Sequence, residues 1–292
     1  MRQIRMRVPG SILALATTLA MVSSQPVLAG SSTVTRSIAS VVGITLQGPG
    51  PSAWDESDTA SLGCDQTGFT PVTDGSYRNK TDAFDNALVL AIDGTSFDDE
   101  DGEVPGAPLA SETIVTADNS TFPSLQVQRW DRVLPTSDTL RTLVRFRNTD
   151  TAPQALTIEW DSDLGSDSGT AVRASSSGNT LYEQGDRWAV SSDDPTTPGD
   201  PVLTWALFGR GAAVKTSAVI TALGNAQTCF TIDFSLGVPA GGIRYLMFFT
   251  ELHGSNAKAV STATRFNSVA AGSPLLTGIR ASVRSKIANW DL

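Results

Sequence analysis

Histidine, cysteine and tyrosine are scarce in this chain of 292 residues, which contains one, two and three of them respectively. The single histidine, His253, cannot build a multi-histidine metal centre, and the sequence has no HExxH motif. Two cysteines are too few for a cysteine-ligated zinc site. Few histidine and tyrosine side chains are therefore available to serve as a general acid or base.

Positive charge is also in short supply, with 21 Lys and Arg residues against 30 Asp and Glu residues and a net charge of −9. Nucleic acids and anionic membrane surfaces bind proteins through a basic footprint. We therefore expect neither of them as a partner, and we interpret the acidic balance as a means of solubility.

The chain has little that resembles a membrane span. Its N-terminal apolar run, residues 11–22, follows three arginines and is too short to cross a bilayer. Pro26 and the triplet Val-Leu-Ala at 27–29 come next. A basic region, a short apolar region and a cleavage site of this A-x-A-like kind predict a secretory signal peptide over residues 1–29. We expect a secreted protein, periplasmic or extracellular, with no membrane insertion.

The two cysteines, Cys64 and Cys229, are predicted to form one disulfide, which is the simplest arrangement in an exported protein. Residues 30–292 suffice for a large hydrophobic core, and β-sandwiches of this size often form a single domain. We therefore expect residues 30–292 to be one domain.

Short β-branched and aromatic runs separated by Gly, Pro, Asp, Asn and Ser dominate up to about residue 249, which is typical of antiparallel strands and turns. The predicted strands cover residues 88–92, 124–134, 140–147, 155–160, 188–191, 203–208, 214–221, 229–236 and 244–249. The last of these is almost entirely apolar, which predicts a central strand buried on both faces.

Helical spacing replaces this pattern towards the end of the chain. Asn256 is placed to cap a helix that runs to about residue 269, and an apolar stripe predicts a second helix over residues 274–290. The sequence thus predicts an all-β fold, a large two-sheet antiparallel β-sandwich, with two short C-terminal helices at about residues 254–290.

Five arginines concentrate on two neighbouring predicted strands, with two tryptophans nearby. The set comprises Arg129, Arg132, Arg141, Arg145 and Arg147, together with Trp130 and Trp160. Alternation places Arg141, Arg145 and Arg147 on one face of their strand. Guanidinium groups bind carboxylates through paired hydrogen bonds and indole offers a flat face to a sugar, so these residues are candidates for binding a carboxylated or sulfated saccharide. The alternative is cross-strand pairing with Asp131, Glu159 and Asp161 on a solvent-facing sheet.

A carboxylate-rich turn follows the predicted strand at residues 155–160. Asp161, Asp163 and Asp167 fall at the first, third and seventh positions of a calcium-loop spacing. Later positions lack the ligands of an EF-hand. Two interpretations stay open, namely a looser structural Ca²⁺ site and a turn whose carboxylates bind backbone N–H groups. No other cofactor is expected.

Two further segments were considered for catalysis. The sequence Ser-Asp-Ser-Gly at 166–169 superficially resembles the nucleophile motif of trypsin-like proteases, but His253 follows this serine, whereas that family places the histidine before it. Serine hydrolysis is therefore not supported. Glu251 and His253 would share one side of an extended segment and are candidates for an acid–base pair. The alternative is that they cap the following helix or face solvent.

Turn motifs alternate with strands between residues 148 and 211. They comprise Asn148-Thr149, DLGSDSGT at 163–170, SSSGN at 175–179, DRWAVSSDD at 186–194 and PVLTWALFGRG at 201–211. This series resembles a module of uncharacterised secreted or surface-exposed bacterial proteins. The similarity continues through residues 238–242 and 247–249 to the Ile-Ala-Asn-Trp at 287–290, so it covers about residues 125–292. The resemblance implies an extracellular β-sandwich, often found within larger exported proteins, and brings no catalytic role with it.

From these observations we expect a secreted, non-enzymatic binding or structural module that recognises an extracellular glycan or a protein surface. The alternative is a carbohydrate-active enzyme, of the polysaccharide lyase or epimerase kind, acting on an anionic extracellular polysaccharide. In that case Arg141 or Arg145 would neutralise a uronate carboxylate, and His253, Tyr245 or Tyr182 would serve as base or acid. The oligomeric state stays open.

Overall fold

Short antiparallel strands form most of the structure, because β-branched and aromatic residues alternate with polar ones and turn-forming residues end each run. The computed structural model describes residues 43–57, 61–62, 64, 67–68, 72–97, 109–110, 112–116, 121–223 and 228–292. The predicted signal peptide at residues 1–29 lies outside the described residues. No helix among those residues is long and apolar enough to cross a membrane.

The larger layer is a seven-stranded sheet in which all neighbouring strands are antiparallel. In sheet order its strands are β13 (Ala171–Ser175), β14 (Trp188–Ser192), β15 (Val202–Ala206), β18 (Ile243–His253), β11 (Thr139–Asn148), β10 (Leu125–Val133) and β9 (Glu112–Thr116). β18 is central, and both of its faces are buried, as predicted from its apolar sequence.

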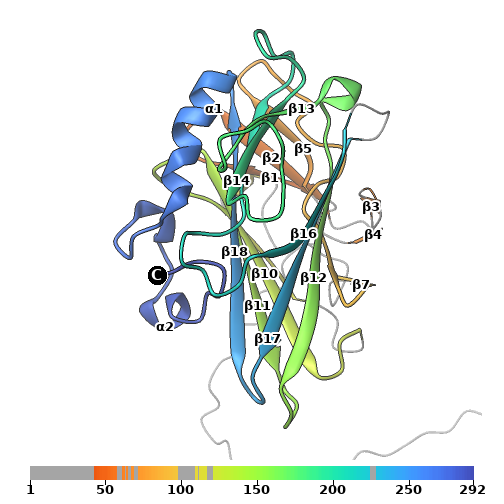
Figure 1. Ribbon diagram of the computed structural model, residues 1–292, viewed down its shortest axis with the longest axis vertical. Helices are drawn as coiled ribbons and strands as arrows, with labels where there is room; N and C mark the ends of the chain where they lie inside the picture. Colours follow the sequence, from red (N-terminus) through yellow and green to blue (C-terminus); the bar gives the residue numbers. More distant parts are fainter. Residues whose placement is uncertain are drawn as a thin grey trace, which may run out of the picture. The chain divides into compact units, whose positions relative to one another are not determined.

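The facing layer is a five-stranded antiparallel sheet. Its order is β16 (Thr216–Ala222), β17 (Cys229–Val238), β12 (Gln154–Asp163), β6 (Val89–Ile92) and β7 (Thr95–Ser96). Aromatic rings from the two layers meet in the core, where the Phe248 ring lies 4.8 Å from Trp160 and 5.3 Å from Phe234, centroid to centroid. The predicted two-sheet β-sandwich is therefore confirmed (Figure 1).

A four-stranded sheet, not predicted from the sequence, adds to this sandwich. It consists of β5 (Val72–Tyr77), β2 (Ser52–Ser57), β1 (Gly43–Gln47) and β8 (Leu109–Ala110), and a separate pair is formed by β3 (Ser61–Leu62) and β4 (Thr67–Gly68). Trp54 of β2 is fully buried in the same core as the two larger sheets. Asp, Ser and Gly interrupt these strands, which is why their sequences read as turns.

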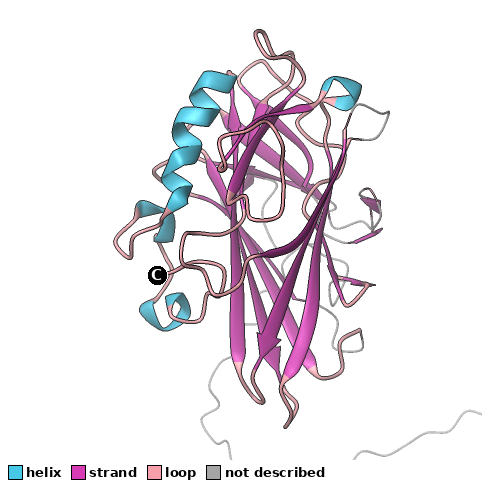
Figure 2. Ribbon diagram, in the orientation of Figure 1, coloured by secondary structure: helices cyan, strands magenta, loops and turns pink. Residues whose placement is uncertain are grey.

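All nine strands predicted from the sequence are present, but the two predicted helices are much shorter than expected. The structure has α1 (Asn256–Ala263), α2 (Ala281–Arg284) and the 3₁₀ turns η1 (Asp167–Gly169), η2 (Thr264–Asn267) and η3 (Pro274–Leu276). Ser255, not Asn256, is the N-cap of α1, and its side chain accepts a hydrogen bond from the Lys258 N–H. Figure 2 shows α1 lying along the outer side of the seven-stranded sheet.

Residues 285–290 do not form the last turns of the predicted helix, because they form hydrogen bonds with the seven-stranded sheet instead. Where β15 ends, β18 has a free edge, and the Tyr245 N–H donates to Lys286 O at 3.0 Å while Tyr245 O accepts from the Ala288 N–H at 2.9 Å. The Asn289 side chain donates to Leu207 O and Met247 O and accepts from the Met247 N–H. These sheet contacts replace the last turns of the helix, while the apolar stripe is still buried.

Candidate functional site

The candidate site lies on the outer face of the seven-stranded sheet, where the antiparallel register aligns side chains of β10, β11 and β18. Arg132 lies directly opposite Arg141, and Trp130 lies opposite Leu143. On the other side of β11, Tyr245 lies opposite Arg145. Period-two alternation sends all of these side chains away from the core, as predicted for the arginines of β11.

The C-terminal segment closes one side of this face and creates a hollow of about 420 Å³, here called the arginine pocket. It is lined by Glu112, Trp130, Arg132, Arg141, Leu143, Tyr245, Gly278, Ile279, Arg280 and Val283. Arg141 Nη1 donates to Leu275 O at 3.0 Å and to Thr277 O at 2.8 Å, which fastens the segment to the sheet. Gly278 has a φ of +81°, a backbone conformation that favours glycine, and a Cβ there would displace the Arg132 guanidinium, whose Nη1 would lie 2.7 Å away.

Positive charge accumulates in the arginine pocket of an otherwise acidic protein. Its lining contains three arginines and one carboxylate, that of Glu112, which lies 3.6 Å from Arg132 Nη1. Burial lowers the pKa of Arg141 to about 10, and repulsion from Arg132 and Arg284 adds to the effect. Among the described residues, no acceptor lies within hydrogen-bonding distance of the buried Nε atoms of Arg132 and Arg141. The excess of guanidinium groups over carboxylates in the lining suits the pocket to an anionic ligand.

The outer face continues beyond the pocket along β11. The Arg145 guanidinium lies over the Trp130 ring, 5.8 Å from its centroid. Arg147 is exposed, and its Nη1 donates to Gln126 Oε1 at 3.4 Å. Of the predicted set, Trp130, Arg132, Arg141, Arg145 and Arg147 therefore share one face.

Arg129 and Trp160 do not belong to this face, and their assignment to a ligand-binding surface is wrong. Arg129 is fully buried between the layers, pairs with Asp131, donates to Leu88 O at 2.7 Å and lies 5.4 Å from the Trp160 ring centroid. The reason is alternation, because odd-numbered residues of β10 point inward and even-numbered ones point outward. Arg129 does pair with Asp131, but the two residues lie on the same strand and inside the core, so this is not the predicted cross-strand pairing on a solvent-facing sheet.

Glu251 and His253 share the outer face of β18, as expected, but they are buried under α1 and η2. Thr139 Oγ1 donates to Glu251 Oε1 at 2.7 Å, Arg265 pairs with the same carboxylate, and His253 Nε2 lies 3.3 Å from Glu251 Oε2. Burial, reinforced by Lys258, lowers the pKa of His253 to about 4. Neither residue lines the arginine pocket, and their contacts hold α1 and η2 on the sheet.

The predicted base or acid Tyr245 does line the arginine pocket. Burial raises the pKa of its hydroxyl, against the opposing effect of Arg145. Tyr182 lines a different hollow together with Val172 and Val219. Of the three residues considered as base or acid, only Tyr245 therefore lies beside the outward arginines.

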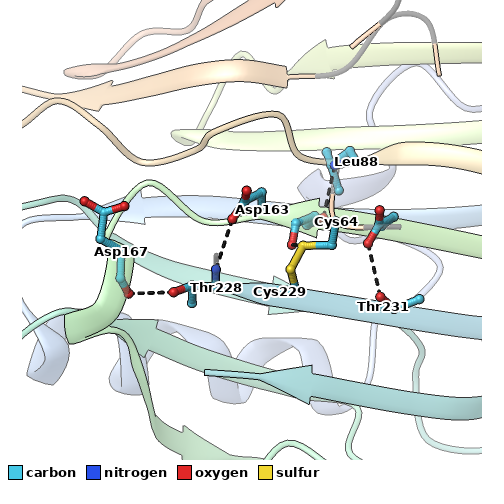
Figure 3. Close-up of a disulfide and its surroundings, with 9 residues drawn as sticks. Cys64, Leu88, Asp163, Asp167, Thr228, Cys229 and Thr231 are labelled. Carbon is cyan, nitrogen blue, oxygen red and sulfur yellow. Dashed lines mark hydrogen bonds between the residues drawn. A yellow bond between two sulfur atoms is a disulfide. The ribbon is translucent and has the colours of Figure 1, made fainter. Parts of the chain in front are cut away.

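The three aspartates considered for Ca²⁺ do not converge. Asp161 accepts from Thr231 Oγ1 at 3.1 Å inside the sandwich, whereas Asp163 accepts from the Thr228 N–H at 3.1 Å (Figure 3). Asp167 uses its backbone oxygen to accept from Thr228 Oγ1. Within the described part of the chain, the three potential ligand atoms found within 4.8 Å of one another belong to Asp163 and to two cysteines in a disulfide. The Asp163 carboxylate therefore binds a backbone N–H, but that N–H belongs to the segment before β17 and not to its own turn.

The predicted disulfide between Cys64 and Cys229 is present and ties the chain near β3 to the start of β17 (Figure 3). It closes a loop with a sequence separation of 165 residues. In the chain-entropy model, closing such a loop stabilises the folded state by up to about 5 kcal/mol.

Among the comparisons with known proteins, only the search of solved structures found matches. No protein-family model matches the sequence, and no curated protein matches it. The Slr1438 protein from Synechocystis sp. PCC 6803 gives a TM-score of 0.47 at 10% identity, over 73% of this chain and 96% of that one. A galactose mutarotase-like protein from Lactobacillus casei gives 0.46 at 10% identity, over 72% and 100%. A heparan sulfate lyase from Pedobacter heparinus gives 0.41 at 10% identity, and 70% of this chain matches 33% of that enzyme.

Proposed function

We propose that this protein is an exported β-sandwich that binds an anionic saccharide in the arginine pocket. The observation that carries the proposal is the lining of the pocket, with three guanidinium groups, one carboxylate and an aromatic wall of Trp130 and Tyr245. Arginine binds carboxylate and sulfate groups through paired, charge-assisted hydrogen bonds. An aromatic face packs against the apolar face of a sugar ring.

Two observations support the chemistry of the ligand and the setting. A bound carboxylate or sulfate would offset the repulsion between Arg132 and Arg141. The Cys64–Cys229 disulfide supports export, because disulfides persist mainly in oxidising compartments.

The test is a titration of the purified protein with oligogalacturonate, a sulfated galactan oligosaccharide and a neutral galacto-oligosaccharide of equal length, followed by calorimetry. We expect binding of an anionic sugar and none of the neutral one. Arg280→Gln should weaken binding about tenfold or more, because one charge-assisted contact is lost. The matched control is Arg210→Gln, which removes an exposed arginine that does not line the pocket. Failure of every anionic sugar to bind would overturn the proposal.

A second candidate function, β-elimination of a uronate polymer, is favoured by one observation, namely that Tyr245 and Arg141 line the same pocket. Arg141 would neutralise the uronate carboxylate. Tyr245 would remove the adjacent carbon-bound proton as its anion and return a proton to the leaving oxygen, while the C–O bond breaks and a C=C bond forms. The raised pKa of Tyr245 disfavours its anion at neutral pH, so binding without turnover is the first candidate.

A single variant separates the two candidates. Tyr245→Phe should abolish the ultraviolet absorbance of an unsaturated product while leaving binding of the polymer within a few-fold of the wild type. If the wild-type protein binds oligogalacturonate and releases no unsaturated product over long incubation, the enzymatic candidate is wrong.

A further inference from the structure

We infer that the ligand is an oligosaccharide chain carrying anionic groups on successive residues, and that it runs from the arginine pocket along the outer face of β11. This inference rests on the proposed function and names its substrate class more closely. Its basis is a continuous row of side chains, here called the β11 track, made of Trp130, Leu143, Arg145 and Arg147 with Gln126 and Gln128 alongside.

The spacing of the arginines argues for more than one sugar residue. Alternate residues of an antiparallel strand lie about 7 Å apart, so the backbone positions of Arg141 and Arg145 are about 14 Å apart and Arg147 lies about 7 Å further along. One pyranose ring is shorter than this row. A guanidinium in the pocket and another at the far end of the track therefore meet anionic groups on different sugar residues.

The track joins the pocket without a break. Trp130 lines the pocket and also carries the Arg145 guanidinium above its ring. Tyr245 likewise lines the pocket and lies opposite Arg145. The Nε of Arg145 is buried, and among the described residues no acceptor lies within hydrogen-bonding distance of it. A ligand that leaves the pocket over Trp130 would thus meet a second guanidinium, that of the half-buried Arg145.

The charge pattern of the track fits repeated anions. The outward residues of β10 and β11 within the described sheet include no Asp or Glu, so Arg145 and Arg147 have no carboxylate directly across the strands. Arg147 is exposed and has only a long contact, 3.4 Å from its Nη1 to Gln126 Oε1. The glutamine amides beside it offer both donors and acceptors to sugar hydroxyls. A net charge of −9 opposes a long polyanion such as nucleic acid, so we assign the track to a short stretch of an acidic polysaccharide.

The experiment is a length series of oligogalacturonates, from the disaccharide to the hexasaccharide, titrated into wild type, Arg280→Gln, Arg147→Gln and the control Arg210→Gln. We expect affinity to rise about tenfold or more with length, since one further charge-assisted contact forms. Arg147→Gln should remove the part of that gain that appears at the greatest lengths, where the chain passes Arg145 and reaches Arg147, and should leave disaccharide affinity unchanged. Arg280→Gln should weaken every length. A longer oligosaccharide can also gain affinity because it can occupy the pocket in more positions along its length. Such a gain would persist in Arg147→Gln, and a gain that persists undiminished in this variant overturns the inference.

The outcomes separate this inference from the proposed function. If all lengths bind equally tightly, the track is not used and the inference fails, while saccharide binding in the pocket stands. If no length binds, the proposed function fails. If an oligothymidylate of equal charge binds as tightly as the hexasaccharide, the track binds polyanions by their charge and does not distinguish a saccharide. The assignment to a polysaccharide is then overturned.

Discussion

Glu56 provides the sharpest test of the interior, because it lies in a buried cluster with Arg129 and Asp131. Glu56 Oε2 accepts a hydrogen bond from Thr113 Oγ1 at 2.7 Å. Burial and the nearby Asp131 carboxylate raise the pKa of Glu56 from 4.5 to about 8, and this outweighs the opposing effects of Arg129 and Thr113. We therefore predict that Glu56 is protonated in the folded protein at neutral pH, while it is ionised in the unfolded chain.

The sign of the resulting pH dependence follows from proton linkage. The folded state holds a proton that the unfolded state has lost, so the stability from Glu56 is fully present below pH 4.5 and is lost as the pH rises through about 8. One unit of pKa corresponds to about 1.4 kcal/mol, so the whole loss is roughly 5 kcal/mol. That is a large part of the about 5–15 kcal/mol that stabilises a typical domain.

His253 acts in the opposite direction and sets the window in which Glu56 can be seen. Burial lowers the pKa of His253 from 6.5 to about 4, so its folded state binds fewer protons and stability rises as the pH increases from 4 to 6.5. The two effects largely cancel in that range. Above about pH 6.5 the His253 contribution is complete, and between about pH 6.5 and 9 the Glu56 effect should cost roughly 2 kcal/mol.

The assay is urea unfolding at pH steps across this window, for wild type, Glu56→Gln and the exposed control Glu183→Gln. Glutamine keeps an acceptor for Thr113 and cannot ionise, so Glu56→Gln should remove the fall in stability, whereas Glu183→Gln should retain it. If the stability difference between wild type and Glu56→Gln stays constant from about pH 6.5 to 9, Glu56 does not carry the buried proton and the reasoning is wrong.

Four further predictions concern the rest of the molecule. Replacing both cysteines of the Cys64–Cys229 disulfide with serine should destabilise the fold by about 2–5 kcal/mol in urea unfolding, because a long loop is released in the unfolded chain. Arg280→Gln should leave the melting temperature unchanged or slightly higher by calorimetry, since it removes one of several crowded positive charges; a fall of many degrees would contradict this. Asn289→Ala should cost about 2–4 kcal/mol in urea unfolding through buried hydrogen bonds lost to Met247 and Leu207, and should also weaken saccharide binding by loosening the segment that carries Arg280. A calcium chelator should not shift melting, because the candidate aspartates do not converge, and a clear shift would restore the calcium interpretation.

The alternation of β10 and β11 made much of the candidate site predictable from the sequence. It placed Arg141, Arg145 and Arg147 on one face of β11, where the structure has them. The same rule separates Arg129 from Arg132, because Arg129 falls in register with inward apolar residues of β10. The prediction that Arg129 faces a ligand is wrong because an arginine is rarely buried, and here Asp131 on the same strand makes its burial possible.

The part of the pocket lining that comes from the C-terminal segment could not be predicted from strand alternation. Gly278 and Arg280 lie more than a hundred residues from β11 in the chain, and no local pattern connects them to Arg141. The apolar stripe of residues 274–290 correctly indicated burial but not helix, because the free edge of β18 offered backbone bonds to residues 286 and 288. Tertiary hydrogen bonding thus overrode local helical spacing.

Arg141 fastens the C-terminal segment to the sheet, but the crowding of Arg132, Arg141 and Arg280 goes beyond what this structural role requires. Like charges directly across a ladder destabilise a sheet, and Arg132 opposite Arg141 is such a pair, with Arg280 added by the C-terminal segment. In the core, β10 gives Arg129 an adjacent Asp131, whereas Glu112 is the one carboxylate that lines the arginine pocket. A surface that needed stability alone would gain from more acidic partners there. Local violations of this kind concentrate at functional sites, and an anionic ligand that relieves the repulsion should bind more tightly because the repulsion exists.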